Sequence, residues 1–120
     1  MSFDWKEYLN LARFLQGQSG SSFNQEAAFR CSVSRAYYAA FCYARNYARD
    51  YYGFSPTRSF RDHDLIRSHF RSRGMTKIAR KLDTLRRWRN SCDYDDMISN
   101  VSLLVASAIA EAQEIIGKLT

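Results

Sequence analysis

The feature that most constrains the fold is a long stretch, residues 24–52, that contains no glycine or proline and is apolar on nearly all sides. A helix that is apolar all round belongs in the middle of a protein rather than on its surface. Small and aromatic side chains fill its central part, residues 36–42. The stretch therefore predicts one long, buried helix around which the rest of the chain packs.

Glycines follow helical patterns along the chain, as C-terminal capping residues do: Gly17, Gly20, Gly53, Gly74 and Gly117. The only proline, Pro56, lies in a linker after Gly53. Between these marks the sequence predicts five helices, over about 4–16, 24–52, 62–72, 76–92 and 96–116. No useful length of chain alternates between polar and apolar residues as a strand does. We therefore expect a single domain, residues 1–120, folded as an all-α, roughly antiparallel up-and-down bundle.

The last predicted helix carries apolar residues at the alternating three- and four-residue spacing of a bundle seam: Ile98, Val101, Val105, Ala108, Ala112, Ile115 and Leu119. A bundle of this length is marginal by itself. The chain also has eight Tyr and eight Phe, which is many for 120 residues. We expect a homodimer that buries part of this aromatic surface.

The sequence argues against membrane insertion and against disulfide bonds. The longest uncharged stretch, 97–110, is well short of the roughly 20 residues of a membrane span, and the N-terminus lacks the layout of a signal peptide. The three cysteines, Cys31, Cys42 and Cys92, include no CxxC pair. On one helix, Cys31 and Cys42 would lie about 16 Å apart, too far for a disulfide. We expect three reduced core thiols in a cytoplasmic protein.

Positive charge is concentrated in one part of the chain. Residues 58–89 contain 11 Lys or Arg and 3 Asp or Glu, a net charge of +8, against +6 for the whole chain. The rest of the chain therefore sums to −2, from +6 minus +8. This excess favours a track for the phosphates of RNA or DNA. The alternative is a solvated face that keeps the protein soluble.

A charged residue interrupts the apolar row of the fourth predicted helix, in which Arg89 follows Leu85 at the core-facing spacing. A buried charge is costly unless it is paired, and Asp93, four residues on, is its natural partner. The alternatives are a structural Arg89–Asp93 ion pair and a guanidinium held in a cleft to grip a phosphate or to stabilise developing charge. Arg35, inside the apolar run of the long helix, is a candidate to pair with Asp93 or with another carboxylate.

Two tyrosines and two histidines complete the set of candidate functional residues. Tyr37 and Tyr38 would point about 100° apart, so one packs inward while the other lines a cleft or a dimer seam; core packing is the alternative for either. His63 and His69 face different sides of one helix, which is poor geometry for a shared metal. Residues 62–64 read as a helix start with acids at the positive end of the dipole, with a general acid or base at His63 as the alternative.

The motifs of several enzyme classes are missing from the sequence. It contains no phosphate-binding glycine loop, no GxSxG, no HExxH and no cluster of Cys and His ligands. We therefore expect no metal and no cofactor.

Residues 34–41, SRAYYAAF, and residues 85–94, LRRWRNSCDY, resemble the HEPN family, named for higher eukaryotes and prokaryotes nucleotide-binding. The resemblance covers most of the chain and fits the small prokaryotic branch. It implies an up-and-down helical bundle that forms a homodimer with a cleft between protomers. Many members are ribonucleases that cut RNA without metal, often toxins encoded beside a minimal nucleotidyltransferase.

The family signature is an Arg followed, after four to six residues, by His, commonly with Asn or Asp directly after the Arg. Arg89 and Asn90 match the first half, but Tyr94 stands where the His would follow a four-residue gap. A phenol with an ordinary pKa near 10 is a poor general base at neutral pH. The candidate catalytic residues are Arg89, Asn90 and Tyr94. The candidate contacts to RNA or nucleotide are Arg35, Arg86, Arg87 and Arg89.

Three functions follow from these observations. The first is a binding module that holds RNA or a nucleotide phosphate in a dimer cleft, in a two-gene stress or defence module with a nucleotidyltransferase partner. The second is a metal-independent endoribonuclease toxin that uses Arg89 for transition-state charge and Tyr94 or His63 for proton transfer. The third is a dimerisation scaffold, in which Arg35, Arg89 and Asp93 form a buried network.

Overall fold

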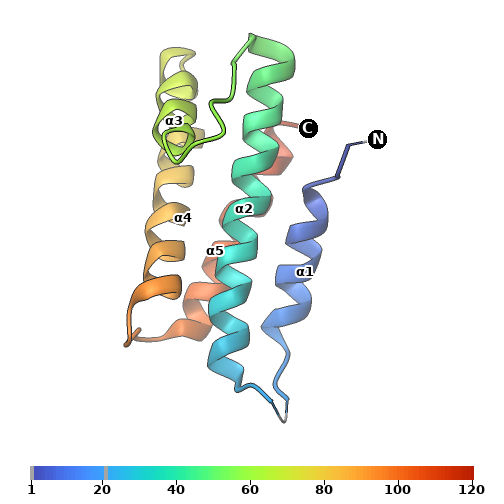
Figure 1. The fold of residues 1–120 in the computed structure, drawn as a ribbon, viewed down its shortest axis with the longest axis vertical. Coiled ribbons are helices and arrows are strands. Elements are labelled where there is room, and N and C mark those ends of the chain that lie inside the picture. The colour runs from blue at the N-terminus through green and yellow to red at the C-terminus, as the bar shows by residue number, and fades with distance from the viewer. Residues whose placement is uncertain (1, 21) are drawn as a thin grey trace.

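The computed structural model describes residues 2–20 and 22–120, which form five helices. In chain order these are α1 (Lys6–Gln16), α2 (Gln25–Tyr52), α3 (Asp62–Ser72), α4 (Thr76–Tyr94) and α5 (Val101–Lys118). No strand occurs among the described residues. Figure 1 shows α1, α2 and α4 standing side by side with α5 behind them, and both termini at the same end of the molecule. The predicted all-α bundle of about five helices is confirmed.

The long helix α2 is the centre of the molecule, because it packs against each of the other four helices (Figure 1). Its buried side chains are mostly small, and alanines at 36, 40, 44 and 48 have no exposed surface. Small side chains let neighbouring helices approach closely. The buried hydroxyl of Ser32 also donates a hydrogen bond of 2.7 Å to the carbonyl oxygen of Ala12 on α1. The prediction of a central buried helix is therefore confirmed.

Local signals set the ends of α2. The side chain of Asn24 accepts a hydrogen bond of 2.9 Å from the backbone N–H of Ala27, which caps the first turn. Gly53 ends the helix in the left-handed region, at a φ of 72°. Gly17 follows α1 directly, and Gly74 comes two residues after Ser72 at the end of α3. Two glycine predictions were wrong. Gly20 lies in the loop before α2, and Gly117 lies inside α5.

The fifth helix begins at Val101, not near residue 96 as predicted, and α4 continues to Tyr94. The backbone is extended at Asp95, with a ψ of 135°, and left-handed at Asn100, with a φ of 53°. Arg30 on α2 holds this connection, since its guanidinium donates to the carbonyl oxygens of Cys92, Asp95 and Asp96. These carbonyl groups are therefore satisfied without helical hydrogen bonds.

The structure also bears on the predictions about the cysteines and about membrane insertion. Cys42 and Cys92 are buried free thiols, but Cys31 is exposed, so its prediction as a core residue was wrong. It lines an open pocket that is formed by α1, α2 and α4. Within residues 2–20 and 22–120, no helix is both long enough and apolar enough to cross a membrane.

Candidate functional site

Arg89 sits near the end of α4 with most of its surface covered, its side chain being 16% exposed. Its Nε donates to Asp93 Oδ2 at 2.8 Å, and its Nη1 donates to Asn90 Oδ1 at 2.9 Å. The ion pair that the helical spacing predicts is therefore present. Asp93 offsets the charge of Arg89, and Asn90 fixes the orientation of its guanidinium plane.

Tyr38 on α2 lies between two guanidinium groups. The Cζ atom of Arg35 is 5.3 Å from the centre of the Tyr38 ring, and that of Arg89 is 5.2 Å from it. Both distances lie within the range of cation–π attraction. Tyr37 has 1% of its surface exposed, whereas Tyr38 is half-buried. One ring packs inward and its neighbour lines the surface, as the helical angle between them predicts.

Arg35 has a different environment from Arg89. Its guanidinium also lies over the ring of Tyr8 on α1, at 4.8 Å, and donates to the Ser34 hydroxyl at 3.3 Å. Among the described residues, no carboxylate forms an ion pair with it. The suggestion that Arg35 pairs with Asp93 or another carboxylate was therefore wrong, because Asp93 is paired along its own helix to Arg89. Arg35 keeps an uncompensated positive charge on an aromatic support.

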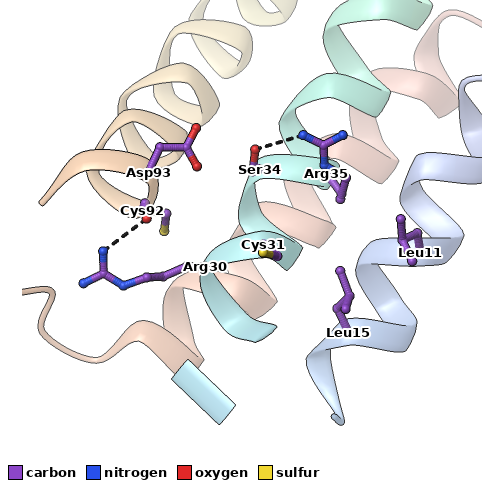
Figure 2. A pocket seen from close by; sticks show the side chains of 8 residues that line it. All are labelled: Leu11, Leu15, Arg30, Cys31, Ser34, Arg35, Cys92 and Asp93. Atoms are coloured by element: carbon purple, nitrogen blue, oxygen red, sulfur yellow. Dashed lines mark hydrogen bonds between the residues drawn. The ribbon is translucent and has the colours of Figure 1, made fainter. Parts of the chain in front are cut away.

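An open pocket of about 610 Å³ lies beside Arg35. Figure 2 shows Leu11 and Leu15 on its α1 side, and Cys92 and Asp93 on its α4 side. Two cations border it, but Arg30 donates to Glu26 and to the carbonyl oxygen of Asp95. It also donates to the carbonyl oxygen of Cys92, as Figure 2 shows. Arg35 is therefore the cation of this pocket that is left to meet an anion.

His63, at the start of α3, forms a partly buried contact with α2 that the sequence did not reveal. Its Nδ1 shares a hydrogen bond with the hydroxyl of Tyr37, and its ring stacks on Phe41 at 4.4 Å. Burial, followed by the guanidinium groups of Arg86, Arg89 and Arg67, lowers the pKa of His63 to about 4. The imidazole is therefore neutral at pH 7, the form that accepts a proton.

Alternating charges connect α3 and α4 beside His63. Asp64 pairs with Arg67 and lies 3.7 Å from Arg86, while Asp83 lies 3.7 Å from Arg67 and 3.4 Å from Arg87. Three arginines share two carboxylates, so the row keeps one net positive charge. Arg67 is only 10% exposed, whereas Arg87 is 68% exposed.

The structure thus gathers most of the predicted site residues but not all of them. Arg35 and Arg89 lie over the Tyr38 ring, and Asn90 accepts a hydrogen bond from Arg89. Arg86 lies beside His63. The Tyr94 ring centre is 6.0 Å from Arg89 Cζ, and the side chain is 75% exposed. Arg87 makes no ring contact among the described residues and bonds to Thr84 and Asp83 instead.

Sequence reasoning missed two functional candidates, Arg67 and Arg30. Arg67 is four residues from His63 and three from Asp64, a spacing that places all three on one side of α3. That pattern could have revealed the Asp64–Arg67 pair. The four-residue spacing of Glu26 and Arg30 predicts their own ion pair. It gives no signal for the carbonyl partners of Arg30, which lie more than 60 residues further along the chain.

Comparison with known proteins found no matching family model, no matching curated protein and no matching solved structure. The resemblance to the HEPN family therefore stays a prediction from the residues that carry it.

Proposed function

We propose that this chain binds RNA or nucleotide phosphates on the surface centred on Tyr38 and flanked by Arg35 and Arg89. The observation that carries the proposal is the Arg35 guanidinium, which rests on Tyr38 and Tyr8 and has no carboxylate partner in the described chain. A positive charge beside an aromatic ring is the combination that single-stranded nucleic acids meet in their binding grooves.

The charge distribution around this surface supports the proposal. Residues 58–89, with a net charge of +8, make up the end of the linker, all of α3 and most of α4. This segment brings Arg86 and Arg89 close to His63 and Tyr37, so the positive region continues from Tyr38 toward α3. A phosphate chain passing over Tyr38 would therefore meet several guanidinium groups.

A second copy of this chain is the partner that we propose for the homodimer. An apolar area on α1 and the following loop supports it, since Leu11, Phe14 and Phe23 are 41%, 63% and 44% exposed. The pocket beside Arg35 shares Leu11 with this area, so a copy seated there would form a wall of the binding cleft. The nucleotidyltransferase partner in a two-gene stress or defence module stays a prediction from the family resemblance.

Matched arginine variants test the binding proposal. Arg35→Gln should weaken binding of a labelled RNA strand by roughly tenfold, equivalent to about 1.4 kcal/mol. Arg89→Gln should weaken it by a smaller factor, because Asp93 already pairs with Arg89. Arg87→Gln is the control, because it removes the same charge from α4 without a contact to Tyr38. Equal affinities for all three variants would contradict a site at Tyr38. The scaffold function would be favoured by two results together. The wild type would bind no RNA, and Arg89→Gln would lower the melting temperature.

The Tyr37–His63 pair favours one second function, a metal-independent endoribonuclease. When Nδ1–H donates to the Tyr37 hydroxyl, Nε2 of His63 carries a lone pair that can take the proton of a ribose 2′-hydroxyl while that oxygen attacks the adjacent phosphorus. Because its lowered pKa makes His63 a weak base, this step depends on stabilisation of the phosphate charge by Arg89. The bond to the 5′ oxygen then breaks, and that oxygen takes a proton from water. The hydroxide that remains takes the proton back from His63, which restores the neutral imidazole. Arg89 would stabilise the charge that develops on the phosphate. In this function His63 replaces the exposed Tyr94 as the proton acceptor.

A cleavage assay on labelled RNA in the presence of a chelator tests this second function. Cleavage by the wild type, lost in Arg89→Gln and in His63→Gln but kept in Arg87→Gln, would support it. Intact RNA with the wild type would remove the enzyme and leave the binding function.

A further inference from the structure

A second pocket lies at the end of α2 that is remote from Arg35. It has a volume of about 610 Å³ and is lined by Tyr52, His69, Ser72 and Arg73. Tyr52 is the last residue of α2, and His69 and Ser72 belong to the last turn of α3. The proposed function does not use this pocket.

The pocket repeats the pair of groups found at Tyr38. The Cζ atom of Arg73 lies 4.2 Å from the centre of the Tyr52 ring, and its Nη2 donates to the Tyr52 carbonyl oxygen at 3.3 Å. Among the described residues, no carboxylate forms an ion pair with Arg73, as none does with Arg35. Each site therefore presents an uncompensated guanidinium on a tyrosine ring.

His69 adds an aromatic wall to this pocket. Its ring centre lies 5.8 Å from that of Tyr52 and 5.6 Å from that of Phe54. Its Nε2 is buried and has no hydrogen-bond partner within the described chain. Burial and the neighbouring Arg73 lower the pKa of His69 below its ordinary value, so the imidazole is neutral at pH 7. Arg73 is therefore the cation of the pocket.

The two sites lie on one side of the same helix. Tyr38 and Tyr52 are 14 residues apart on α2, from 52 minus 38. At about 100° and 1.5 Å per residue, their directions differ by about 40° and their positions by about 21 Å. Both tyrosines belong to one continuous helix, which holds this separation fixed.

The linker between α2 and α3 adds positive charge between the two sites. It starts directly after Tyr52 and leads to His63, whose ring centre is 6.4 Å from that of Tyr38. Residues 53–61 include no acid and two exposed arginines, Arg58 and Arg61. Positive groups therefore continue from one site to the other.

We propose that the Tyr52–Arg73 pocket is a second contact for the same RNA strand that binds at Tyr38. Arg73 holds a phosphate, and the Tyr52 and His69 rings face the adjoining nucleoside. This inference rests on the proposed function and narrows its ligand to oligonucleotides. A strand stacked at about 3.4 Å per nucleotide needs about six nucleotides to span the two sites.

The dependence of affinity on RNA length tests this inference. The wild type should bind a strand of about twelve nucleotides at least about fivefold more tightly than a strand of about four. This factor is the smallest that stacking of one base on an aromatic side chain typically contributes. Arg73→Gln should abolish this preference and change the affinity for the short strand by less than about twofold. Arg71→Gln is the control, because Arg71 is an exposed arginine on α3 that does not line the pocket.

The outcomes separate this inference from the function on which it rests. Equal length preferences in Arg73→Gln and Arg71→Gln, with both strands bound through Arg35, would overturn the second contact alone. Failure of the wild type to bind either strand would overturn the proposed function and this inference together. Tyr52→Leu provides a second variant, which should also abolish the length preference, and thermal melts of all variants check that they fold.

Discussion

The role of each arginine in this protein depends on its nearest partners. Arg89 has a carboxylate four residues away on its own helix, and Arg67 has carboxylates on two helices. Within residues 2–20 and 22–120, Arg35 contacts only aromatic rings and a hydroxyl. A charge that is already paired offers less to a phosphate than one supported by rings alone. Arg35 is therefore the residue on which we base the binding site.

His63 provides a residue-scale prediction that can be measured directly. Its pKa is lowered to about 4, chiefly by burial and then by three nearby arginines. In an NMR titration its ring signals should move near pH 4, far below the ordinary value of 6.5. A midpoint near the ordinary value would show that the imidazole is solvated and would contradict the Tyr37–His63 contact.

The same shift has a consequence for stability. Because the unfolded chain binds this proton more readily than the folded chain does, His63 contributes its full stability above pH 6.5 and loses it as pH falls toward 4. The free energy of unfolding of the wild type should therefore fall between these pH values. The fall should be smaller in His63→Gln, measured by urea denaturation.

The predictability of the site at this scale depends on distance along the chain. The Arg89–Asp93 pair could be predicted because both residues lie on one helix, four positions apart. The Tyr37–His63 bond joins residues 26 positions apart on two helices, and Arg35 meets Tyr8 on a third. Such contacts depend on how helices pack, which a helical period does not specify. The HEPN-like pattern directed attention to residues 34–41 and 85–94 but did not predict the contact between His63 and Tyr37.

At the scale of elements, the linker after α2 is held by one carboxylate. Asp62 is 4% exposed and accepts hydrogen bonds from the backbone N–H groups of Thr57 and Arg58, each at 3.0 Å, and from the Thr57 hydroxyl at 2.6 Å. Arg58 has a left-handed backbone, with a φ of 63°. Burial alone would raise the pKa of Asp62, but these hydrogen bonds lower it below its ordinary value.

Replacing Asp62 should therefore loosen the linker and the start of α3. Asp62→Ala removes the charged acceptor of three hydrogen bonds from Thr57 and Arg58, so the free energy of unfolding should fall by about 1–3 kcal/mol. Urea denaturation at pH 7 measures this difference. Because the folded pKa is lowered, the difference should shrink as pH falls below the ordinary value of 3.8. A stability equal to that of the wild type at pH 7 would contradict the capping role.

The helices themselves were predictable to different degrees. Asn24 and Gly53 mark α2 through chemistry that acts within one turn, so both of its ends were found. The start of α5 was misplaced because Arg30, from a distant part of the chain, holds residues 95 and 96 out of a helix. Met97 and Ile98 are apolar, and their pattern alone looks like a helix start.

At the scale of the whole molecule, the exposed apolar area on α1 provides a test of the homodimer. We expect sedimentation of the wild type at twice the mass of one chain, and Phe14→Glu should shift it to the monomer by placing a charge in the interface. Leu103→Glu is the control, since Leu103 on α5 is 66% exposed and lies on another helix. A monomeric wild type at the highest measurable concentration would contradict the dimer.

The salt dependence of RNA affinity tests the central claim most directly. If Arg35, Arg89 and their neighbours neutralise two or three phosphates of a single strand, the logarithm of the association constant should fall with that of the salt concentration at a slope of about −1.4 to −2.1. Arg35→Gln should make this slope less steep by about 0.7, whereas Arg87→Gln should leave it unchanged. An affinity that stays constant over a severalfold rise in salt would contradict phosphate binding at this surface.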